Sequence, residues 1–191
     1  MDNSLYLASL FRQNAGWFAG HTAFRNGLHG DGWLEKGAII RNVAVLDTVA
    51  ERQAAAIRTR FRDADLIVCT GECGAVVAAA VARFLDLPIA LTVSEGDMLS
   101  FHRMHLPASG HRAILVEDLV FSGTEVRRHA DFIPGTGLEF LGVSAWVNRQ
   151  GDRIAGVPIH SLMPPPFSLF PAADCPLCRR AVPLAYTGIR E

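Results

Sequence analysis

The sequence has little lysine, and its charges nearly cancel. Lys36 is the single lysine, and lysine and arginine together number 18 against 19 aspartates and glutamates. This balance gives no overall field that would gather nucleic acid or an anionic membrane, so we expect neither as a partner. The scarcity of lysine also restricts any mechanism that needs an amine, because only Lys36 can supply a side-chain amine.

Long apolar runs and abundant cysteine are lacking as well. The longest apolar region, residues 75–93, contains Arg83, Asp86 and Pro88, which excludes a membrane span there. Four cysteines in 191 residues do not make a disulfide scaffold, in agreement with a reducing compartment. The first residues reach Arg12 before any long apolar run, unlike a secretory signal. We therefore expect a cytoplasmic protein.

The composition and the apolar pattern predict one domain over residues 1–191. Half of the residues are apolar, enough for a sizeable core. Strands are expected at 65–70, 88–93, 113–117, 138–147 and 157–162, and helices at 3–12, 43–61, 74–85 and 122–133, while 14–36 is expected to be irregular with short strands. Strand runs without polar alternation are typical of burial on both faces. Strands alternating with helices predict a three-layer α/β fold around a mostly parallel sheet.

The stretch ILVEDLVFSGTEV places two adjacent carboxylates after a buried strand. Glu117 and Asp118 are expected at the carboxyl edge of the sheet, where ligands of open parallel sheets bind. Because the two charges repel each other, a cation or a pair of sugar hydroxyls would stabilise them. Ser122 to Thr124 offer hydroxyls and backbone N–H groups where a helix begins, which suits phosphate. Solvated acids and a plain capping box of Ser122 with Glu125 are the structural alternative.

These residues resemble the phosphoribosyl pyrophosphate signature of the type I phosphoribosyltransferases. Further segments resemble orotate phosphoribosyltransferases and their close relatives: FRNGLHGDGWLEK, TGECGA, VNRQG and DCPLCRRAVPL. The resemblance implies a three-layer fold with a central, mostly parallel sheet flanked by helices and a small hood formed by about 14–40 and 150–190. It implies an enzyme that transfers a phosphoribosyl group from phosphoribosyl pyrophosphate to a heterocyclic base, above all orotate, with Mg²⁺ as cofactor.

The resemblance also implies roles for individual residues. Glu117 and Asp118 would hold the ribose hydroxyls, with Asp118 as a catalytic residue, and both are the candidate protein ligands of a Mg²⁺ ion held mainly by the substrate. The cradle for the 5-phosphate would consist of Phe121, Ser122, Gly123, Thr124 and Glu125. A second anion loop would hold pyrophosphate through backbone amides and would consist of Thr70, Gly71, Glu72, Cys73 and Gly74.

A mobile loop at about 94–112 would close over the leaving pyrophosphate. Orotate enzymes commonly place lysine in this loop, and this sequence has none there. Arg103 is the best substitute and is assigned as catalytic, with His102 and His105 as lesser candidates. An arginine keeps its charge but cannot give up a proton, whereas either histidine can near neutral pH. A solvated loop with incidental histidines is the alternative interpretation.

The base pocket is expected around Arg149, which matches the position where orotate enzymes place an arginine against the pyrimidine. Trp33 would either stack on the base or serve in packing, and Lys36 would either bind an anion or lie on the surface. Gly30 and Gly32 replace larger residues of the relatives, so a different base is an alternative to orotate. A non-catalytic regulator that binds phosphoribosyl pyrophosphate is a further alternative. The resemblance also implies a homodimer.

Cys175 and Cys178 have the spacing of zinc ligands, but a complete site would need two more ligands. The sequence therefore favours two thiols packed on the domain and leaves metal binding open. His160 is interpreted as an ordinary strand residue rather than a ligand.

Overall fold

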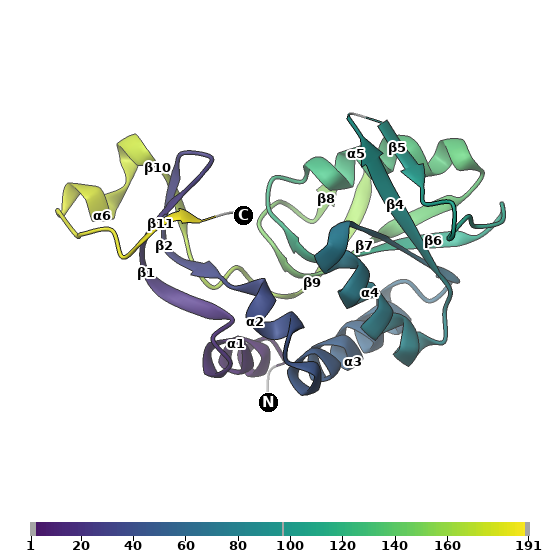
Figure 1. Cartoon of the computed structure of the whole chain (residues 1–191), viewed down its shortest axis with the longest axis horizontal. Helices are drawn as coiled ribbons and strands as arrows, with labels where there is room; N and C mark the ends of the chain where they lie inside the picture. The colour runs from purple at the N-terminus through teal and green to yellow at the C-terminus, as the bar shows by residue number, and fades with distance from the viewer. Residues whose placement is uncertain (1–2, 97, 190–191) are drawn as a thin grey trace. The chain divides into compact units, whose positions relative to one another are not determined.

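The computed structural model describes residues 3–96 and 98–189, which divide into two units with a sheet in each (Figure 1). The larger unit comprises Ile40–Pro164, and the smaller one contains the described residues up to Ile39 and from Pro165 onward. The predicted hood included residues 150–164, but these contribute two strands to the larger unit.

The larger unit is built on a sheet of seven strands in the order β5-β4-β3-β6-β7-β9-β8. Its parallel strands are β4 (Ile89–Glu95), β3 (Leu66–Thr70), β6 (Arg112–Val120), β7 (Glu139–Asn148) and β9 (Val157–Met163). The edge strands β5 (Met98–Phe101) and β8 (Arg153–Ile154) are antiparallel to their neighbours. The predicted mostly parallel sheet is confirmed.

Helices cover both faces of this sheet. Figure 1 shows α3 (Val43–Arg60) and α4 (Gly71–Leu85) on one side, and α5 (Thr124–Phe132) on the other. The helix α5 continues into a 3-10 turn, η1 (Ile133–Thr136). Leu66–Cys69 of β3 and Ala113–Val116 of β6 are buried between these layers, which explains why both runs are apolar without alternation.

The smaller unit has a sheet of four strands in the order β10-β2-β1-β11. Its elements are α1 (Asn3–Gln13), β1 (Trp17–Phe24), β2 (Leu28–Leu34), α2 (Lys36–Ile40, whose last residue belongs to the larger unit), β10 (Leu169–Pro171), η2 (Ala172–Asp174), α6 (Pro176–Arg179) and β11 (Tyr186–Ile189). The short strands expected within 14–36 are present as β1 and β2, but they pair as an antiparallel hairpin, with one register shift between Ala19 and Thr22, instead of lying in irregular structure. Arg25, Asn26 and Gly27 connect the two strands, the Gly27 N–H donates to Phe24 O at 3.1 Å, and glycine accommodates φ +83° at position 27.

The segment expected as a loop at about 94–112 begins and ends in regular structure. Strand β4 extends to Glu95, and β5 pairs with it from Thr92↔Phe101 to Glu95↔Met98. Strand β6 then begins at Arg112. Among the described residues of this segment, Gly96, in a turn, and 102–111 lie outside the strands. None of the described helices has both the length and the apolar character that crossing a membrane requires.

Gln53 of α3 joins the helix layer to the two central strands. Its side chain is fully buried, and its Nε2 donates to the backbone oxygens of Ser144 at 2.9 Å and Glu117 at 3.3 Å. The indole Nε1 of Trp146 donates to Gln53 Oε1 at 3.0 Å. A single amide thus satisfies polar groups on β6 and β7 in the interior, where an unmade hydrogen bond is costly.

We predict that Gln53→Met lowers the free energy of unfolding by about 1–3 kcal/mol for each buried polar group that loses its partner. Methionine has a similar length but offers no donor for the two carbonyl groups and only a weak acceptor for Trp146. Urea unfolding would measure the change, with the exposed Glu51→Gln on the same helix as control. Equal stability of the two variants would contradict this role of Gln53.

Candidate active site

The two adjacent carboxylates lie inside a strand, not beyond its end. β6 was expected to end at Glu117, but it continues to Val120, and Glu117 is paired with Ala145 of β7. Strong β-formers after the acids, Leu119 and Val120, explain the extension. Both acids are buried, with exposed fractions of 9% for Glu117 and 4% for Asp118. The interpretation of these acids as solvated is therefore wrong.

Glu117 lies beside the amino end of α4. A β-carbon at Gly74 would be 3.7 Å from Glu117 Oε2, so the structure brings the acid pair and the Thr70–Gly74 turn together. The charge also reaches the neighbouring strand β3. Burial raises the pKa of the Cys69 thiol to about 12, and the negative charge of Glu117 adds to this rise. Cys69 is consequently an inert core thiol.

A tight turn connects β6 with α5. Gly123 is the residue before the helix, in the left-handed region at φ +75°, and a β-carbon there would be 2.5 Å from Ile154 Cδ1. The hydroxyl oxygens of Ser122 and Thr124 lie 2.9 Å apart, and the Thr124 backbone N–H contacts Ser122 Oγ at 3.4 Å. The helix has no side-chain cap, so the alternative of a capping box between Ser122 and Glu125 is wrong.

The Thr70–Gly74 turn lines a cavity of about 550 Å³. β3 ends at Thr70, and α4 begins at Gly71 with φ +65° and no side-chain cap. The cavity is lined from this side by Thr70, Gly71, Glu72 and Ala75, and from β4 by Leu91, Thr92, Val93 and Ser94. Glu72 and Cys73 are exposed, so this helix start is accessible to a ligand.

His129 connects the first turn of α5 to strand β4, a contact that no local motif predicts. The ring is fully buried, with Nδ1 at 2.7 Å from the Glu125 backbone oxygen and Nε2 at 2.9 Å from Thr92 Oγ1. Because a carbonyl oxygen only accepts, Nδ1 carries the proton. Thr92 lines the cavity, and its single hydroxyl proton faces two acceptors, His129 Nε2 and Cys69 O at 3.0 Å, so it can be donated to only one of them at a time. Burial lowers the pKa of His129, so the ring is neutral at pH 7.

Arg149 lies beside the turn that follows β6. Its backbone N–H donates to Val120 O at 2.9 Å, and its guanidinium lies 5.9 Å from the centre of the Phe121 ring. Gln150, which also contacts this turn, was not among the site residues predicted from the sequence. Its Nε2 donates to Phe121 O at 2.6 Å, and its Cγ would be 3.5 Å from a β-carbon at Gly123.

His102, Arg103 and His105 follow β5 directly. The backbone N–H of His102 donates to Leu91 O at 2.8 Å, which attaches this turn to a strand that lines the cavity. The two imidazole rings lie 5.8 Å apart. Arg103 and His105 are exposed to solvent, whereas His102 is half-buried.

Trp33 and Lys36 belong to the smaller unit. The Trp33 ring stacks on Phe18 with 5.1 Å between ring centres and meets Tyr186 edge-on at 5.7 Å. These contacts fit the packing alternative. Lys36 is half-buried at the first position of α2. Their roles as base contacts stay predictions.

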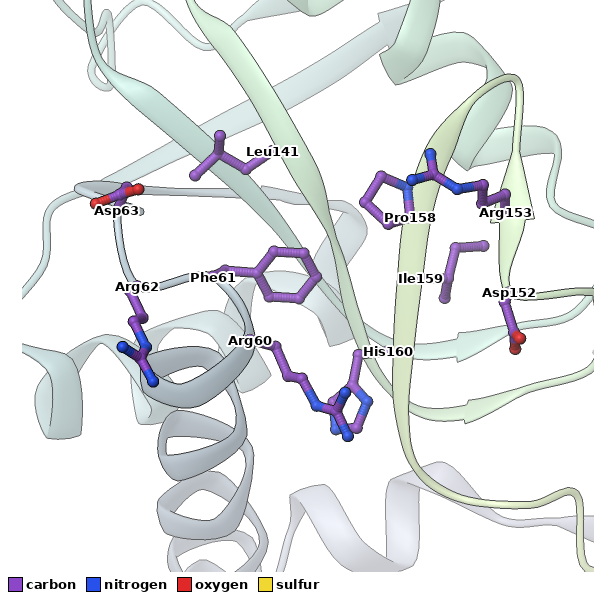
Figure 2. Close-up of a pocket in the computed structure, with 10 residues that line it drawn as sticks. All are labelled: Arg60, Phe61, Arg62, Asp63, Leu141, Asp152, Arg153, Pro158, Ile159 and His160. Carbon is purple, nitrogen blue, oxygen red and sulfur yellow. The ribbon is translucent and has the colours of Figure 1, made fainter.

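A cavity of about 660 Å³ lies at the other end of the parallel strands, where β7 and β9 begin (Figure 2). Its lining residues are Arg60, Phe61, Arg62, Asp63, Leu141, Asp152, Arg153, Pro158, Ile159 and His160. His160 is half-buried in β9, and burial together with the nearby Arg60 lowers its pKa. Ligands of parallel sheets bind beyond the carboxyl ends of strands, so the cavity at Thr70 is the better candidate although it is smaller.

Comparisons with known proteins decide the family. No model of a protein family matches the chain. The chain is 30% identical over 179 residues to the orotate phosphoribosyltransferase of Thermus thermophilus, which covers 92% of this chain and 96% of the relative. This chain belongs to the orotate phosphoribosyltransferase family. It is 25% identical over 186 residues to the orotate phosphoribosyltransferase of Carboxydothermus hydrogenoformans, with 97% of both chains covered. The chain is accordingly a phosphoribosyltransferase.

Solved structures agree with the fold of this family. The orotate phosphoribosyltransferase of Aeropyrum pernix superposes with a TM-score of 0.72 at 17% identity, covering 83% of this chain and 93% of that one. The orotate phosphoribosyltransferase of Mycobacterium tuberculosis, solved with inorganic phosphate, gives a TM-score of 0.65 at 17% identity and covers 85% of this chain and 95% of that one. The predicted type I phosphoribosyltransferase fold is confirmed.

The buried His129 predicts a pH dependence of stability. Because the pKa of His129 is lowered in the folded state, the unfolded chain binds more protons, and the free energy of unfolding falls as the pH drops below about 6.5. His129→Gln should reduce the difference in stability between pH 7.5 and pH 5.5, measured by urea unfolding. The lowered pKa of His160 leaves a residual slope. Identical slopes for the wild type and the variant would refute this contribution.

Proposed function

We propose that the chain transfers a phosphoribosyl group from phosphoribosyl pyrophosphate to orotate and releases orotidine monophosphate and pyrophosphate. The observation that carries this proposal is the acid pair of β6 buried next to Gly74 and followed, after two strand residues, by the turn that opens α5. Groups suited to a diol and to two phosphate groups thus lie at the carboxyl ends of β3 and β6.

Glu117 and Asp118 are proposed to accept hydrogen bonds from the ribose hydroxyls. A hydrogen bond to a charged group contributes about 1.5–3 kcal/mol. Successive side chains leave a strand on opposite sides, so the two acids are expected to have unequal roles. The donor set consists of carboxylate oxygens, which suits the hard cation Mg²⁺. When bound, Mg²⁺ would neutralise the charge of the departing pyrophosphate.

Two helix starts are the proposed anion sites. In the turn after β6, residues from Phe121 to Glu125 would cradle the 5-phosphate with backbone N–H groups and the hydroxyls of Ser122 and Thr124. The turn from Thr70 to Gly74 would hold pyrophosphate, supported by the cavity of about 550 Å³ beside it. Neither helix has a side-chain cap at its start, which is compatible with an anion in that place.

Positioning and charge neutralisation carry the proposed reaction. A ring nitrogen of the base displaces pyrophosphate from the anomeric carbon through a transition state that resembles an oxocarbenium ion, and no covalent nucleophile is needed. Arg149 is proposed to hold the carboxylate of orotate, because its fork of donors matches a carboxylate. Arg103, with His102 and His105 beside it, is proposed to stabilise the leaving pyrophosphate. We also propose, from the resemblance to the family, that two copies of the chain form a homodimer.

One observation favours a second candidate, a regulator that binds phosphoribosyl pyrophosphate without turnover. The segment 94–112 carries no lysine, so Arg103 has to replace the amine of related enzymes. The two candidates differ in the fate of the pyrophosphate. The test is to mix the chain with phosphoribosyl pyrophosphate, Mg²⁺ and orotate, and to measure orotidine monophosphate and pyrophosphate. Parallel reactions with adenine and uracil test for another base.

Turnover with orotate supports the proposal, and loss of turnover on chelation of Mg²⁺ supports its metal requirement. Turnover with another base alone would overturn the choice of orotate. Thermal stabilisation by phosphoribosyl pyrophosphate without turnover of any base would establish the regulator instead, because a ligand at 100 times its Kd adds about 2.7 kcal/mol to stability.

We predict that Asp118→Asn weakens binding of phosphoribosyl pyrophosphate about 10- to 100-fold, because a charged acceptor becomes an amide. Calorimetry in the presence of Mg²⁺ measures the Kd, and Glu117→Gln, tested in parallel, shows which acid contributes more. Asp131→Asn, an exposed residue of α5, is the matched control. Unchanged affinity in both acid variants would rule out the sugar-binding role.

Arg103→Ala should lower kcat about 10²-fold with a smaller change in substrate binding, because the guanidinium acts on charge that develops as pyrophosphate departs. Steady-state kinetics with phosphoribosyl pyrophosphate as the varied substrate separates kcat from KM. Arg41→Ala, also an exposed arginine of the larger unit, is the control. Equal losses in kcat and affinity would indicate plain ground-state binding by Arg103.

A further inference from the structure

Four potential metal ligands converge in the smaller unit, outside the residues assigned to phosphoribosyl transfer. His21 lies on β1, His29 on β2, Cys175 directly before α6, and Cys178 within α6. Their ligand atoms all lie within 4.8 Å of one another. The sequence showed only the two cysteines, because the two histidines are about 150 residues away in the chain and become neighbours only through the fold.

The distances match a tetrahedral zinc site. With Zn–N bonds of about 2.0–2.1 Å and Zn–S bonds of about 2.3 Å, tetrahedral geometry requires about 3.4 Å between two nitrogens and about 3.6 Å between nitrogen and sulfur. His21 Nε2 lies 3.0 Å from His29 Nδ1, 3.5 Å from Cys175 Sγ and 3.6 Å from Cys178 Sγ. Cys178 Sγ lies 3.2 Å from His29 Nδ1. Each separation is within a few tenths of an ångström of the ideal value.

His21 is oriented as a ligand. Its Nδ1 lies 2.7 Å from Val182 O, and because a carbonyl oxygen only accepts, Nδ1 carries the proton. The Nε2 lone pair of the neutral ring then faces the cluster, and such a hydrogen bond to the second nitrogen is typical of metal-binding histidines. The register of β1 against β2 also shifts between Ala19 and Thr22. This irregularity contains His21, and bulges redirect side chains.

Burial suits a closed structural site with access from one side. Cys175 is fully buried and His21 is 4% exposed, whereas His29 is half-buried and Cys178 is exposed. Most of the segment 171–185 is exposed to solvent, so few apolar contacts hold it in place. A four-ligand site of two cysteines and two histidines keeps no open position for substrate, which is the arrangement of structural zinc.

We propose that His21, His29, Cys175 and Cys178 bind one Zn²⁺ ion that fastens the C-terminal segment to the β1-β2 hairpin. The hairpin supplies the two histidines and the C-terminal segment supplies the two cysteines, so the ion would cross-link these two parts of the chain. The segment also contacts β1 through the backbone, where Ala185 N–H donates to His21 O at 2.8 Å. The unfolded chain holds no preformed zinc site. Zinc bound to the folded state would therefore add its binding free energy to the stability of the fold.

The first test is the metal content of the full chain, produced without a histidine tag in zinc-supplemented medium. Inductively coupled plasma mass spectrometry should find about one zinc ion per chain. A mercurial reagent that modifies the thiols should release this zinc. Replacement by Co²⁺ should give the intense visible absorption of a tetrahedral thiolate site. Less than a tenth of a zinc per chain, or a Cys175–Cys178 disulfide in the purified protein, would overturn the proposal.

Variants identify the ligands. Cys178→Ser and His29→Gln should each weaken zinc binding more than about tenfold in competition with a chromogenic chelator. Cys73→Ser, which changes an exposed cysteine of the larger unit, should retain the full metal content. Zinc retained at wild-type affinity by both ligand variants would refute the site. If these variants do not fold, mercurial release and cobalt absorption of the wild type still decide.

Discussion

Burial of two neighbouring carboxylates within a parallel strand is the constraint on which the larger unit depends. Burying a charge costs free energy unless polar groups compensate it, so the surroundings of Glu117 and Asp118 have to be specific. Gln53 holds the backbone at Glu117 to the next strand, and Gly74 leaves room beside the Glu117 carboxylate. Burial raises the pKa of Cys69, and the negative charge of Glu117 adds to this rise. The residues around Glu117 therefore belong both to the core and to the candidate active site.

Much of the fold could be predicted from periodicity. The helix of 43–60 and the buried strands β3 and β7 lie within a residue or so of their expected bounds, because long amphipathic or apolar patterns leave few alternatives. The short strands expected within 14–36 are present, but their pairing as the β1-β2 hairpin was not predicted, because its glycines and aromatics hide the alternation. The extension of β6 to Val120 was not predicted, because charged residues are rarely buried and two adjacent acids therefore indicate the end of a buried strand. The structure instead buries both acids within the strand.

The candidate site was predictable where a local motif carries it and unpredictable where distant residues meet. Ser122 to Thr124 form one local turn, and its position could be predicted. His129 and Gln150 act through contacts made only in the folded chain, to Thr92 and to Phe121 O respectively. The cysteine and histidine cluster is the clearest example, because Cys175 and His21 are in contact across a sequence separation of 154 residues. No periodicity or spacing signals such a meeting.

The pairing of β5 with β4 has a mechanical consequence. Phe101 is tied into the ladder opposite Thr92, and His102 donates its N–H to Leu91, so the chain is anchored up to the residue before Arg103. The guanidinium of Arg103 can therefore move only through rotations of its own side chain and of a few backbone torsions. Fixing the Arg103 side chain on a ligand would therefore cost less conformational entropy than fixing a residue in the middle of an unpaired loop.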